Sequence, residues 1–335
     1  MRPLDGMRVL DLSQQLPGPY ATLLLAAMGA EVTKVEPPSG DASRSLDPEM
    51  FGNVNAGKSS ITLDLKTEHG RQGLYRLVRR HDVVVEGFRP GVAARLGCDA
   101  PALHALRPEL VYCSISGAGQ TGPLARHPTH DISLQAVAGA LAGDGDVDRI
   151  GVPWVDLAAG SSAALAITAA WHAGRGVHLD MSMLDAALAW SRVKPSAVEG
   201  RREPTYGTLR TADGGRVVIA LLEDAMWRRL CTALGWDDWA ADERLGRHVD
   251  RRRHADEVRD RLEESAAAMT SSALLDLAAR HDLPIGPADG GTDPDAATQI
   301  ATRVRPDAPP WRACVPLPDA LVGELRPAPA LTDDR

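Results

Sequence analysis

The sequence predicts an α/β protein: a large domain with a parallel sheet, followed by a smaller α/β domain. Short apolar runs rich in β-branched residues alternate with helical segments along the first half of the chain. These runs are apolar almost throughout, which is typical of parallel strands that helices cover on both faces. After residue 206 the pattern changes to a hairpin signal followed by helices rich in Arg, Asp and Glu.

The expected strands of the large domain are Met7–Leu12, Glu31–Glu36, Ser60–Leu65, Asp82–Glu86 and Leu110–Ile115. The expected helices are Pro19–Gly29, Thr67–Arg80, Leu157–Ala173 and Ser182–Trp190. Gly29 is placed near a helix end because glycine adopts the left-handed conformation common there. The Leu157–Ala173 helix is apolar on all sides, so we expect it to be buried.

The composition along the chain gives the expected domain boundaries. The large domain spans residues 1–193, and residues 194–206 form a linker in which prolines and a glycine lie among charges. The small domain spans residues 207–291, where Asp213-Gly214-Gly215 turns a hairpin. Residues 292–335, rich in Pro, Asp and Ala, are expected to return to the large domain.

Composition and charge exclude several classes of function. The chain has 335 residues and a net charge of −8, with no basic run of the kind that binds nucleic acid. No apolar stretch reaches the roughly 20 residues of a membrane span, and four charges in Met1–Leu12 argue against a signal peptide. The cysteines, which form no CxxC pair, are Cys98, Cys113, Cys231 and Cys314. We therefore expect a cytoplasmic protein without a metal site, a membrane partner or a nucleic-acid partner.

Two cations follow strands of the predicted sheet. Lys66 comes after the third strand, and Arg89 comes directly after the fourth. Ligands of open α/β sheets bind at the carboxyl ends of the strands, so both cations are candidates for pairing with a phosphate. The alternative is that they are solvated turn charges.

The segment Gly117–Gly122 fits the dinucleotide-binding pattern G-x-G-x-x-G. However, Pro123 and Pro128 follow it, and no helix opens at its third glycine to receive a phosphate. We therefore interpret this segment as a structural or substrate-lining loop.

Three titratable residues are candidates for chemistry. Asp156 is placed just before the Leu157–Ala173 helix, where it is either a helix cap or a catalytic carboxylate whose ionised form the helix amides favour. His130, followed by Asp131, is either a packing residue or a base that titrates near neutral pH. Glu223 follows a strand of the small domain and is otherwise an ordinary carboxylate at a helix start.

The ordered set of segments resembles the family III CoA-transferases (CaiB/BaiF), which include α-methylacyl-CoA racemase, and its motifs are closest to that racemase. The segments that carry this resemblance are Leu4–Leu12, Pro17-Gly18-Pro19, Met28–Pro37, Asn55–Lys66, Glu86–Gly97, Val111–Pro123, His130–Gly139 and Asp156–Gly160. The resemblance implies an interlocked homodimer with a Rossmann-like, CoA-binding large domain. CoA then enters as part of an acyl-CoA thioester substrate, and no cofactor is permanently bound.

The resemblance also implies roles for individual residues. Asp156 matches the catalytic aspartate of the family, His130 matches the racemase histidine, and Glu223 matches a glutamate that supports it. By position, the residues lining the CoA site are Leu63, Lys66, Arg89, Arg95 and Asp131.

Matching the histidine favours a racemase, in which two bases exchange the α-proton through a thioester enolate. A first alternative is CoA transfer between carboxylic acids through an aspartyl-CoA thioester at Asp156. A second alternative is an acyl-CoA-binding protein without activity. The small domain has only Gly286 and Gly290-Gly291 where some transferases of the family carry a glycine-rich loop.

Overall fold

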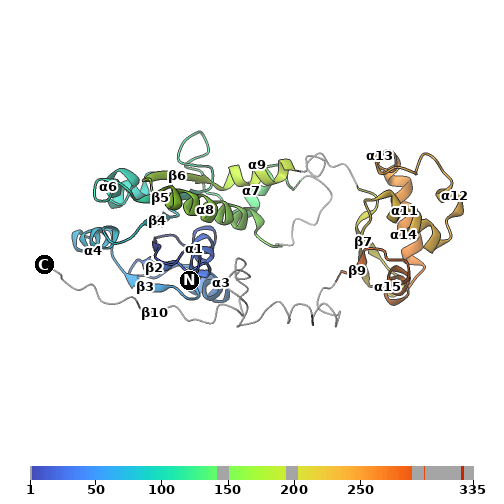
Figure 1. Ribbon diagram of the computed structural model, residues 1–335, viewed down its shortest axis with the longest axis horizontal. Coiled ribbons are helices and arrows are strands. Elements are labelled where there is room, and N and C mark those ends of the chain that lie inside the picture. Colours follow the sequence, from blue (N-terminus) through green and yellow to red (C-terminus); the bar gives the residue numbers. More distant parts are fainter. Residues whose placement is uncertain (1, 142–150, 194–202, 289–297, 299–325, 328–335) are drawn as a thin grey trace. The chain divides into compact units, whose positions relative to one another are not determined.

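The computed structural model describes residues 2–141, 151–193, 203–288, 298 and 326–327 (Figure 1). The chain divides into two compact units. One comprises residues 1–198 and 304–335, and the other comprises residues 199–303. Most of the expected linker and of the expected C-terminal segment lies outside the described residues, as do Gly290 and Gly291.

The large unit is built on a seven-stranded sheet in the order β10-β3-β2-β1-β4-β5-β6, with every neighbouring pair parallel. The bounds are β1 Arg8–Asp11, β2 Glu31–Glu36, β3 Ser59–Thr62, β4 Val83–Glu86, β5 Val111–Ser116, β6 Val177–Ser182 and β10 Arg326–Pro327. The order from β3 to β6 is that of doubly wound, Rossmann-like sheets, in which the strand order reverses between β1 and β4. The predicted α/β class with a parallel sheet is confirmed.

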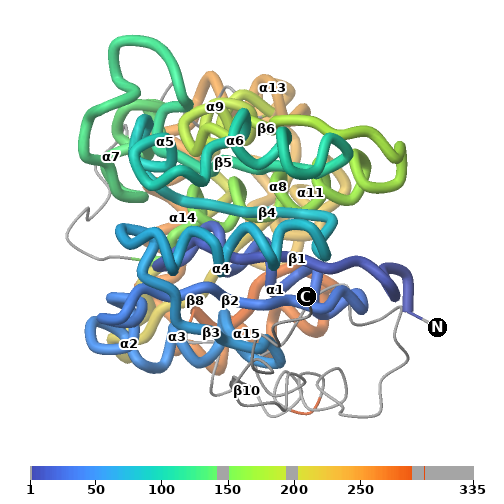
Figure 2. Tube along the Cα trace, turned by 90° about the vertical axis from the view of Figure 1, so that its left-hand side faces the viewer, coloured from blue at the N-terminus to red at the C-terminus, as the bar shows by residue number. Residues whose placement is uncertain are grey.

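Helices cover both faces of this sheet, as Figure 2 shows. On one face lie α1 (Pro17–Ala27), α8 (Trp154–Ala173) and α9 (Met183–Val193), and on the other lie α4 (Glu68–Val78), α5 (Val92–Leu96) and α6 (Ala100–His104). Alternate residues of β1 and β4 pack into the cores on opposite faces of the sheet. Val9 and Val83 pack with the first group of helices, whereas Leu10 and Val84 pack with the second. Successive side chains of a strand point to opposite faces, so this alternation fixes the layers.

Helices α1 and α8 approach each other unusually closely. A Cβ atom added to Gly160 would lie 2.6 Å from the carbonyl oxygen of Pro17 and 2.9 Å from a ring carbon of Tyr20. Only glycine permits this approach, so Gly160 allows the start of α1 to lie against the first half of α8.

Five predicted strands and four predicted helices of the large unit appear close to their expected bounds. Strand β6 was not predicted. Its side chains alternate, with His178 and Asp180 exposed and Val177 and Leu179 packed against the core. It is an edge strand, and the apolar pattern of a buried strand is therefore absent from its sequence. The short elements α2 (Ser43–Leu46), α3 (Pro48–Asn55) and α7 (Asp131–Val137) complete the large unit.

A buried ionic network lies beneath the loop between β1 and α1. Lys58 Nζ lies 3.0 Å from Asp11 Oδ2 and also donates to Thr22 Oγ1 and the Pro19 carbonyl. Lys34 Nζ lies 2.9 Å from Asp41 Oδ2 and donates to the Ser13 carbonyl. Burial by itself raises the pKa of Asp11, but the charges of Lys58 and Lys34 outweigh it and lower that pKa. The network fixes the end of β1 to the first turns of α1.

The second unit has a three-stranded antiparallel sheet in the order β7-β8-β9. The predicted hairpin is present as β7 (Tyr206–Arg210) and β8 (Arg216–Ala220), and β9 is Ile285–Pro287. The helices are α11 Asp224–Leu234, α12 Asp237–Ala240, α13 His248–Arg251, α14 Ala255–Ala267 and α15 Ser271–Arg280, with a 3₁₀ turn at Arg252–His254. The core contains the rings of Trp227, Trp236 and Trp239, which meet in tilted and edge-on pairs.

Candidate active site

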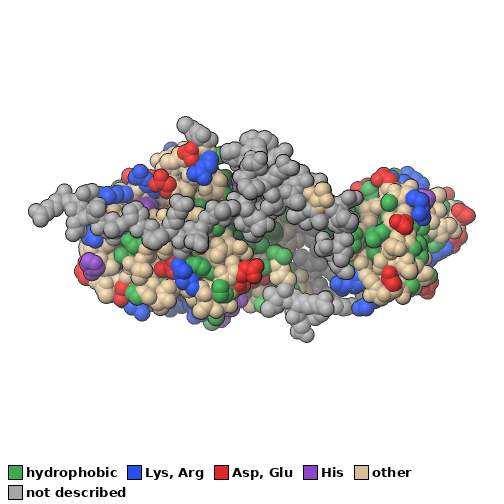
Figure 3. All heavy atoms as spheres, turned by 90° about the horizontal axis from the view of Figure 1, so that it is seen from below, with side chains coloured by type: hydrophobic (Ala, Val, Ile, Leu, Met, Phe, Trp, Pro, Cys, Tyr) green, Lys and Arg blue, Asp and Glu red, His purple; other side chains and the backbone are tan. Residues whose placement is uncertain are grey.

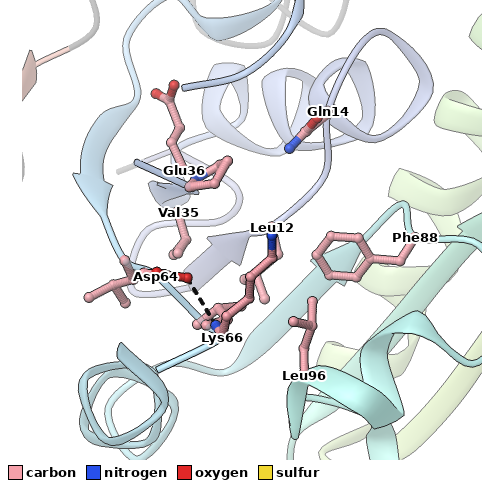
Figure 4. A pocket seen from close by; sticks show the side chains of 11 residues that line it. Leu12, Gln14, Val35, Glu36, Asp64, Lys66, Phe88 and Leu96 are labelled. Carbon is pink, nitrogen blue, oxygen red and sulfur yellow. Dashed lines mark hydrogen bonds between the residues drawn. The ribbon is translucent and has the colours of Figure 1, made fainter. Parts of the chain in front are cut away.

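A pocket opens at the carboxyl ends of β1 to β4, next to the point where the strand order reverses (Figure 4). Its apolar walls come from the ends of these strands and from α5: Leu12, Val35, Pro37, Leu63, Leu65, Phe88 and Leu96. Gln14, Glu36, Asp64 and Lys66 add polar groups. An apolar slot with a few polar groups at a strand-order switch is where doubly wound folds bind nucleotides.

The turn after β3 brings two of the expected CoA-site residues to this pocket. Leu63 and Lys66 both line it. Asp64 shapes the turn, because its Oδ1 accepts a hydrogen bond of 3.0 Å from the Lys66 amide, drawn as a dashed line in Figure 4. The Lys66 side chain is exposed, so its ammonium group is available to an anion.

Arg89 and Arg95 lie beside the pocket and do not line it. Arg89 follows Phe88 and is exposed, and Arg95 Nη1 donates to the Gly91 carbonyl at 3.3 Å. A second, more polar cavity lies next to them, between Pro90-Gly91 and the loop of residues 120–126. No helix starts between Gly117 and His130. The segment Gly117–Gly122 is therefore a loop, and part of it lines this cavity.

Asp156 lies inside helix α8, which corrects the expected helix start. The helix begins at Trp154, and Pro153 occupies the N-cap position without a side-chain hydrogen bond. Asp156 is therefore in the first turn, three positions beyond the cap. Its carboxylate accepts no hydrogen bond from any residue that the structure describes, so the expected stabilisation of its ionised form by helix amides is wrong.

The amides at the start of α8 bind a different carboxylate. Asp131 Oδ2 accepts hydrogen bonds from Val155 N at 2.8 Å and from Asp156 N at 3.1 Å. Its other oxygen accepts from the side chain of Gln135. Asp131, expected beside CoA, thus lies at the start of α8, next to the backbone of Asp156.

The neighbourhood of Asp156 changes its acidity. Burial, together with the negative charge of Asp131, raises the pKa of Asp156 from 3.8 to about 7. A carboxyl group with such a pKa is part ionised and part protonated at neutral pH. Strongly perturbed carboxyl groups of this kind are concentrated at functional sites.

His130 and Glu223 occupy different settings. His130 is the N-cap residue of α7 and has an exposed side chain; its amide donates to Ser133 Oγ at 3.0 Å. It is joined to Asp131 by the chain, so it lies near the start of α8. Glu223 is the exposed N-cap residue of α11, in the second unit. The buried Arg251 fixes the turn after it by donating to Asp224 Oδ1 at 2.8 Å.

Sequence reasoning missed several residues of the site. Leu12, Gln14 and Phe88 line the pocket although none was named as a ligand contact. Their position directly after β1 and β4 was the available signal, because the carboxyl ends of parallel strands share one edge of the sheet. The contact of Asp131 with α8 joins residues 24 and 25 positions apart and carries no sequence signal.

Within the described residues, no group of three or more His, Cys, Asp or Glu side chains is arranged to hold a metal ion. No described helix is both long enough and apolar enough to cross a bilayer. The cysteines at positions 98, 113 and 231 are buried and unpaired. On the face seen in Figure 3, acidic and basic side chains are interspersed over the described residues of both units.

Known proteins resemble this chain over most of its length. It is 36% identical over 312 residues to the acetyl-CoA:oxalate CoA-transferase of Acetobacter aceti, an alignment covering 85% of this chain and 80% of that protein. It is 35% identical to the succinate–glutarate CoA-transferase of Agrobacterium fabrum, covering 90% and 84%. The crystal structure of Rv3272 from Mycobacterium tuberculosis matches with a TM-score of 0.80 and 32% identity, covering 90% and 87%.

The sequence model of CoA-transferase family III matches residues 4–303. This match includes most of both units and all the segments that carried the resemblance. The Rossmann-like sheet and the pocket at its carboxyl edge agree with it. The chain is therefore an enzyme of CoA-transferase family III.

Proposed function

We propose that this enzyme transfers CoA between carboxylic acids, with Asp156 as the nucleophile. The observation that carries the proposal is the carboxyl group of Asp156. It lies in the first turn of α8 and accepts no hydrogen bond from the described residues, and burial with the charge of Asp131 raises its pKa to about 7. A carboxylate that is basic yet partly ionised at neutral pH suits covalent catalysis.

The chemistry needs two symmetrical halves. In the first, an oxygen of Asp156 attacks the thioester carbonyl of the donor; a C–O bond forms, the C–S bond breaks, and CoA thiolate leaves. The thiolate then attacks the Asp156 carbonyl of this mixed anhydride, which releases the donor acid and leaves an aspartyl-CoA thioester. In the second half the acceptor carboxylate follows the same steps in reverse. Asp156 ends as a free carboxylate, and no proton or electron is gained or lost.

The pocket at the end of β1 to β4 is the proposed site for the adenine end of CoA. Its walls of Leu12, Val35 and Phe88 suit a flat aromatic base, and Lys66 is one of its polar lining residues. Arg89 and Arg95, exposed beside it, are suited to pair with phosphates of the same ligand. Asp131 contacts the start of α8, so its proposed position is near the thioester end of CoA and not near the adenine.

The acids are proposed to be short-chain carboxylates, with dicarboxylates the first to test. The two curated relatives described above are named for oxalate, succinate and glutarate. Their names favour CoA transfer. They do not favour the α-proton exchange that the match of His130 to the racemase histidine predicts. Under transfer, His130 and Glu223 are not required as acid and base.

We also propose that the enzyme is a homodimer in which two chains interlock. Support comes from large apolar side chains exposed on α8 and α9: Leu165 is 74% exposed, Trp190 52% and Val193 85%. Large apolar side chains that are this exposed are often covered by a partner, and a second copy of the chain is the proposed partner. Sedimentation equilibrium at micromolar concentration tests this, and a stable monomer would refute it.

One assay separates the candidate reactions. The enzyme is incubated in D2O with acetyl-CoA, succinyl-CoA or a chiral 2-methylacyl-CoA as donor, with and without oxalate, succinate or glutarate, and the acyl-CoAs are analysed by mass spectrometry. We expect a new acyl-CoA that depends on the acceptor acid and is absent for Asp156→Asn. Deuterium in the α-position of the 2-methylacyl-CoA with loss of its stereochemical purity, and without any acceptor-dependent product, would instead establish the racemase reaction.

A further inference from the structure

The start of helix α8 lacks a cap of its own. Pro153 stands at the N-cap position and has no side-chain oxygen to accept from the first amides. Two of these amides, on Val155 and Asp156, therefore need a hydrogen-bond acceptor from elsewhere. In a helix with an acidic residue in its first turn, that residue would ordinarily be favoured there, because the amides and the helix dipole stabilise negative charge.

In this protein the carboxylate on those amides belongs to Asp131 and not to Asp156. Asp131 Oδ2 accepts from both Val155 N at 2.8 Å and Asp156 N at 3.1 Å. Gln135 holds the second oxygen of Asp131, and the capping turn from His130 to Ser133 fixes the start of α7. The anion on the α8 amides is therefore held by contacts on two helices.

We propose that Asp131 is a positioning residue for Asp156: its carboxylate occupies the first-turn amides of α8, so that Asp156 does not bind them, and its negative charge keeps the Asp156 carboxylate basic for attack on the thioester. This inference rests on the proposed role of Asp156 as nucleophile. Asp131 acts through Asp156 and need not touch the substrate.

The charges around α8 agree with this assignment. The titratable or charged side chains on the elements packed against α8 are Tyr20 on α1, Asp131 on α7, Tyr112 and Cys113 on β5, His178 and Asp180 on β6, and Asp185 and Arg192 on α9. Among the described residues, Asp131 is the one whose charge adds to burial in raising the pKa of Asp156. Two carboxylates near one helix start disfavour ionisation of the less well bonded one.

The test replaces the charge and retains the hydrogen-bond acceptor. In Asp131→Asn the side-chain oxygen can still accept from the α8 amides, but its negative charge is lost. We expect the acid limb of the pH–kcat/KM profile for CoA transfer to shift to lower pH by about half a unit or more. The rate on the plateau should fall, because a less basic carboxylate is a weaker nucleophile. Asp131→Ser, a smaller uncharged cap, should shift the limb in the same direction and serves if the first variant folds poorly.

A matched control is available on helix α3. Asp47 caps α3 by accepting from Met50 N at 2.9 Å. Asp47→Asn makes the same chemical change at a helix cap away from α8, and it should leave the position of the acid limb unchanged. Far-UV circular dichroism checks that all variants are folded.

The outcomes separate this inference from the proposed function. Full transfer by Asp156→Asn would overturn the nucleophile, and the role of Asp131 with it. If Asp156→Asn is inactive but Asp131→Asn and Asp131→Ser keep the wild-type acid limb, the positioning role is wrong while the proposed function stands. A rise in KM for acyl-CoA with an unmoved limb would likewise overturn it and make Asp131 a CoA contact.

Discussion

Asp131 Oδ2 lies 3.1 Å from the backbone nitrogen of Asp156, so that two carboxyl groups meet at the start of one helix with only one of them bound to its amides. This arrangement explains the acidity of the candidate nucleophile. The bonded carboxylate is stabilised as an anion, whereas the unbonded one is buried beside a like charge.

The first prediction concerns pH. Burial and the charge of Asp131 raise the pKa of Asp156 to about 7, and attack requires the ionised form. The rate of CoA transfer should therefore rise with pH through about 7 and level off above it. Below that value it should fall about tenfold per pH unit. The measurement is kcat/KM between pH 5 and 9; a profile that is flat from pH 5 to 7 would contradict the assignment.

The second prediction concerns CoA binding. Lys66→Ala should weaken CoA by about 1.5–3 kcal/mol, the size of a charge-assisted contact, because Lys66 lines the pocket with an exposed ammonium group. Arg8→Ala is the control, since Arg8 begins β1 at the opposite edge of the sheet. Titration calorimetry with free CoA measures both. Equal affinities of Lys66→Ala and wild type would remove Lys66 from the site.

The third prediction concerns packing beneath the site. Gly160→Ala places a Cβ atom 2.6 Å from the Pro17 carbonyl oxygen, so α1 and α8 must separate. We expect a loss of about 1–3 kcal/mol in the free energy of unfolding, as for other overpacked cores. The control is Gly52→Ala in helix α3, where a Cβ meets nothing within 4 Å and should stabilise the helix slightly.

Urea unfolding followed by circular dichroism compares the two glycine variants with the wild type. Wild-type stability in Gly160→Ala would show that the two helices tolerate a wider spacing. A loss of activity in that variant larger than its loss of stability would show that the α1–α8 contact also sets the position of Asp156.

The sequence predicted the strands whose side chains are buried on both faces, because Val83 to Val85 and Val111 to Cys113 form unbroken apolar runs. It did not predict β6, an edge strand in which exposed His178 and Asp180 interrupt that pattern. It also placed the start of α8 too late, because the N-cap residue of this helix is Pro153 and no polar side chain marks its start.

The electrostatics of the site were beyond prediction for a different reason. Lys34 lies in a strand whose polar residues ordinarily face solvent, yet its side chain is fully buried against Asp41. Likewise, the composition of the His130-Asp131 step does not reveal that Asp131 bonds to a helix that starts more than 20 residues later. Such pairings depend on tertiary contacts, whereas motif and period describe only local structure.

The central claim is that Asp156 becomes covalently acylated during turnover. The most direct measurement treats the enzyme with a donor acyl-CoA and hydroxylamine, in the absence of an acceptor acid, and maps the modified peptide by mass spectrometry. We predict an acyl-CoA-dependent hydroxamate on Asp156, absent from the Asp156→Asn variant. Turnover of acyl-CoA and acceptor acid by the wild type with Asp156 unmodified throughout would contradict the account.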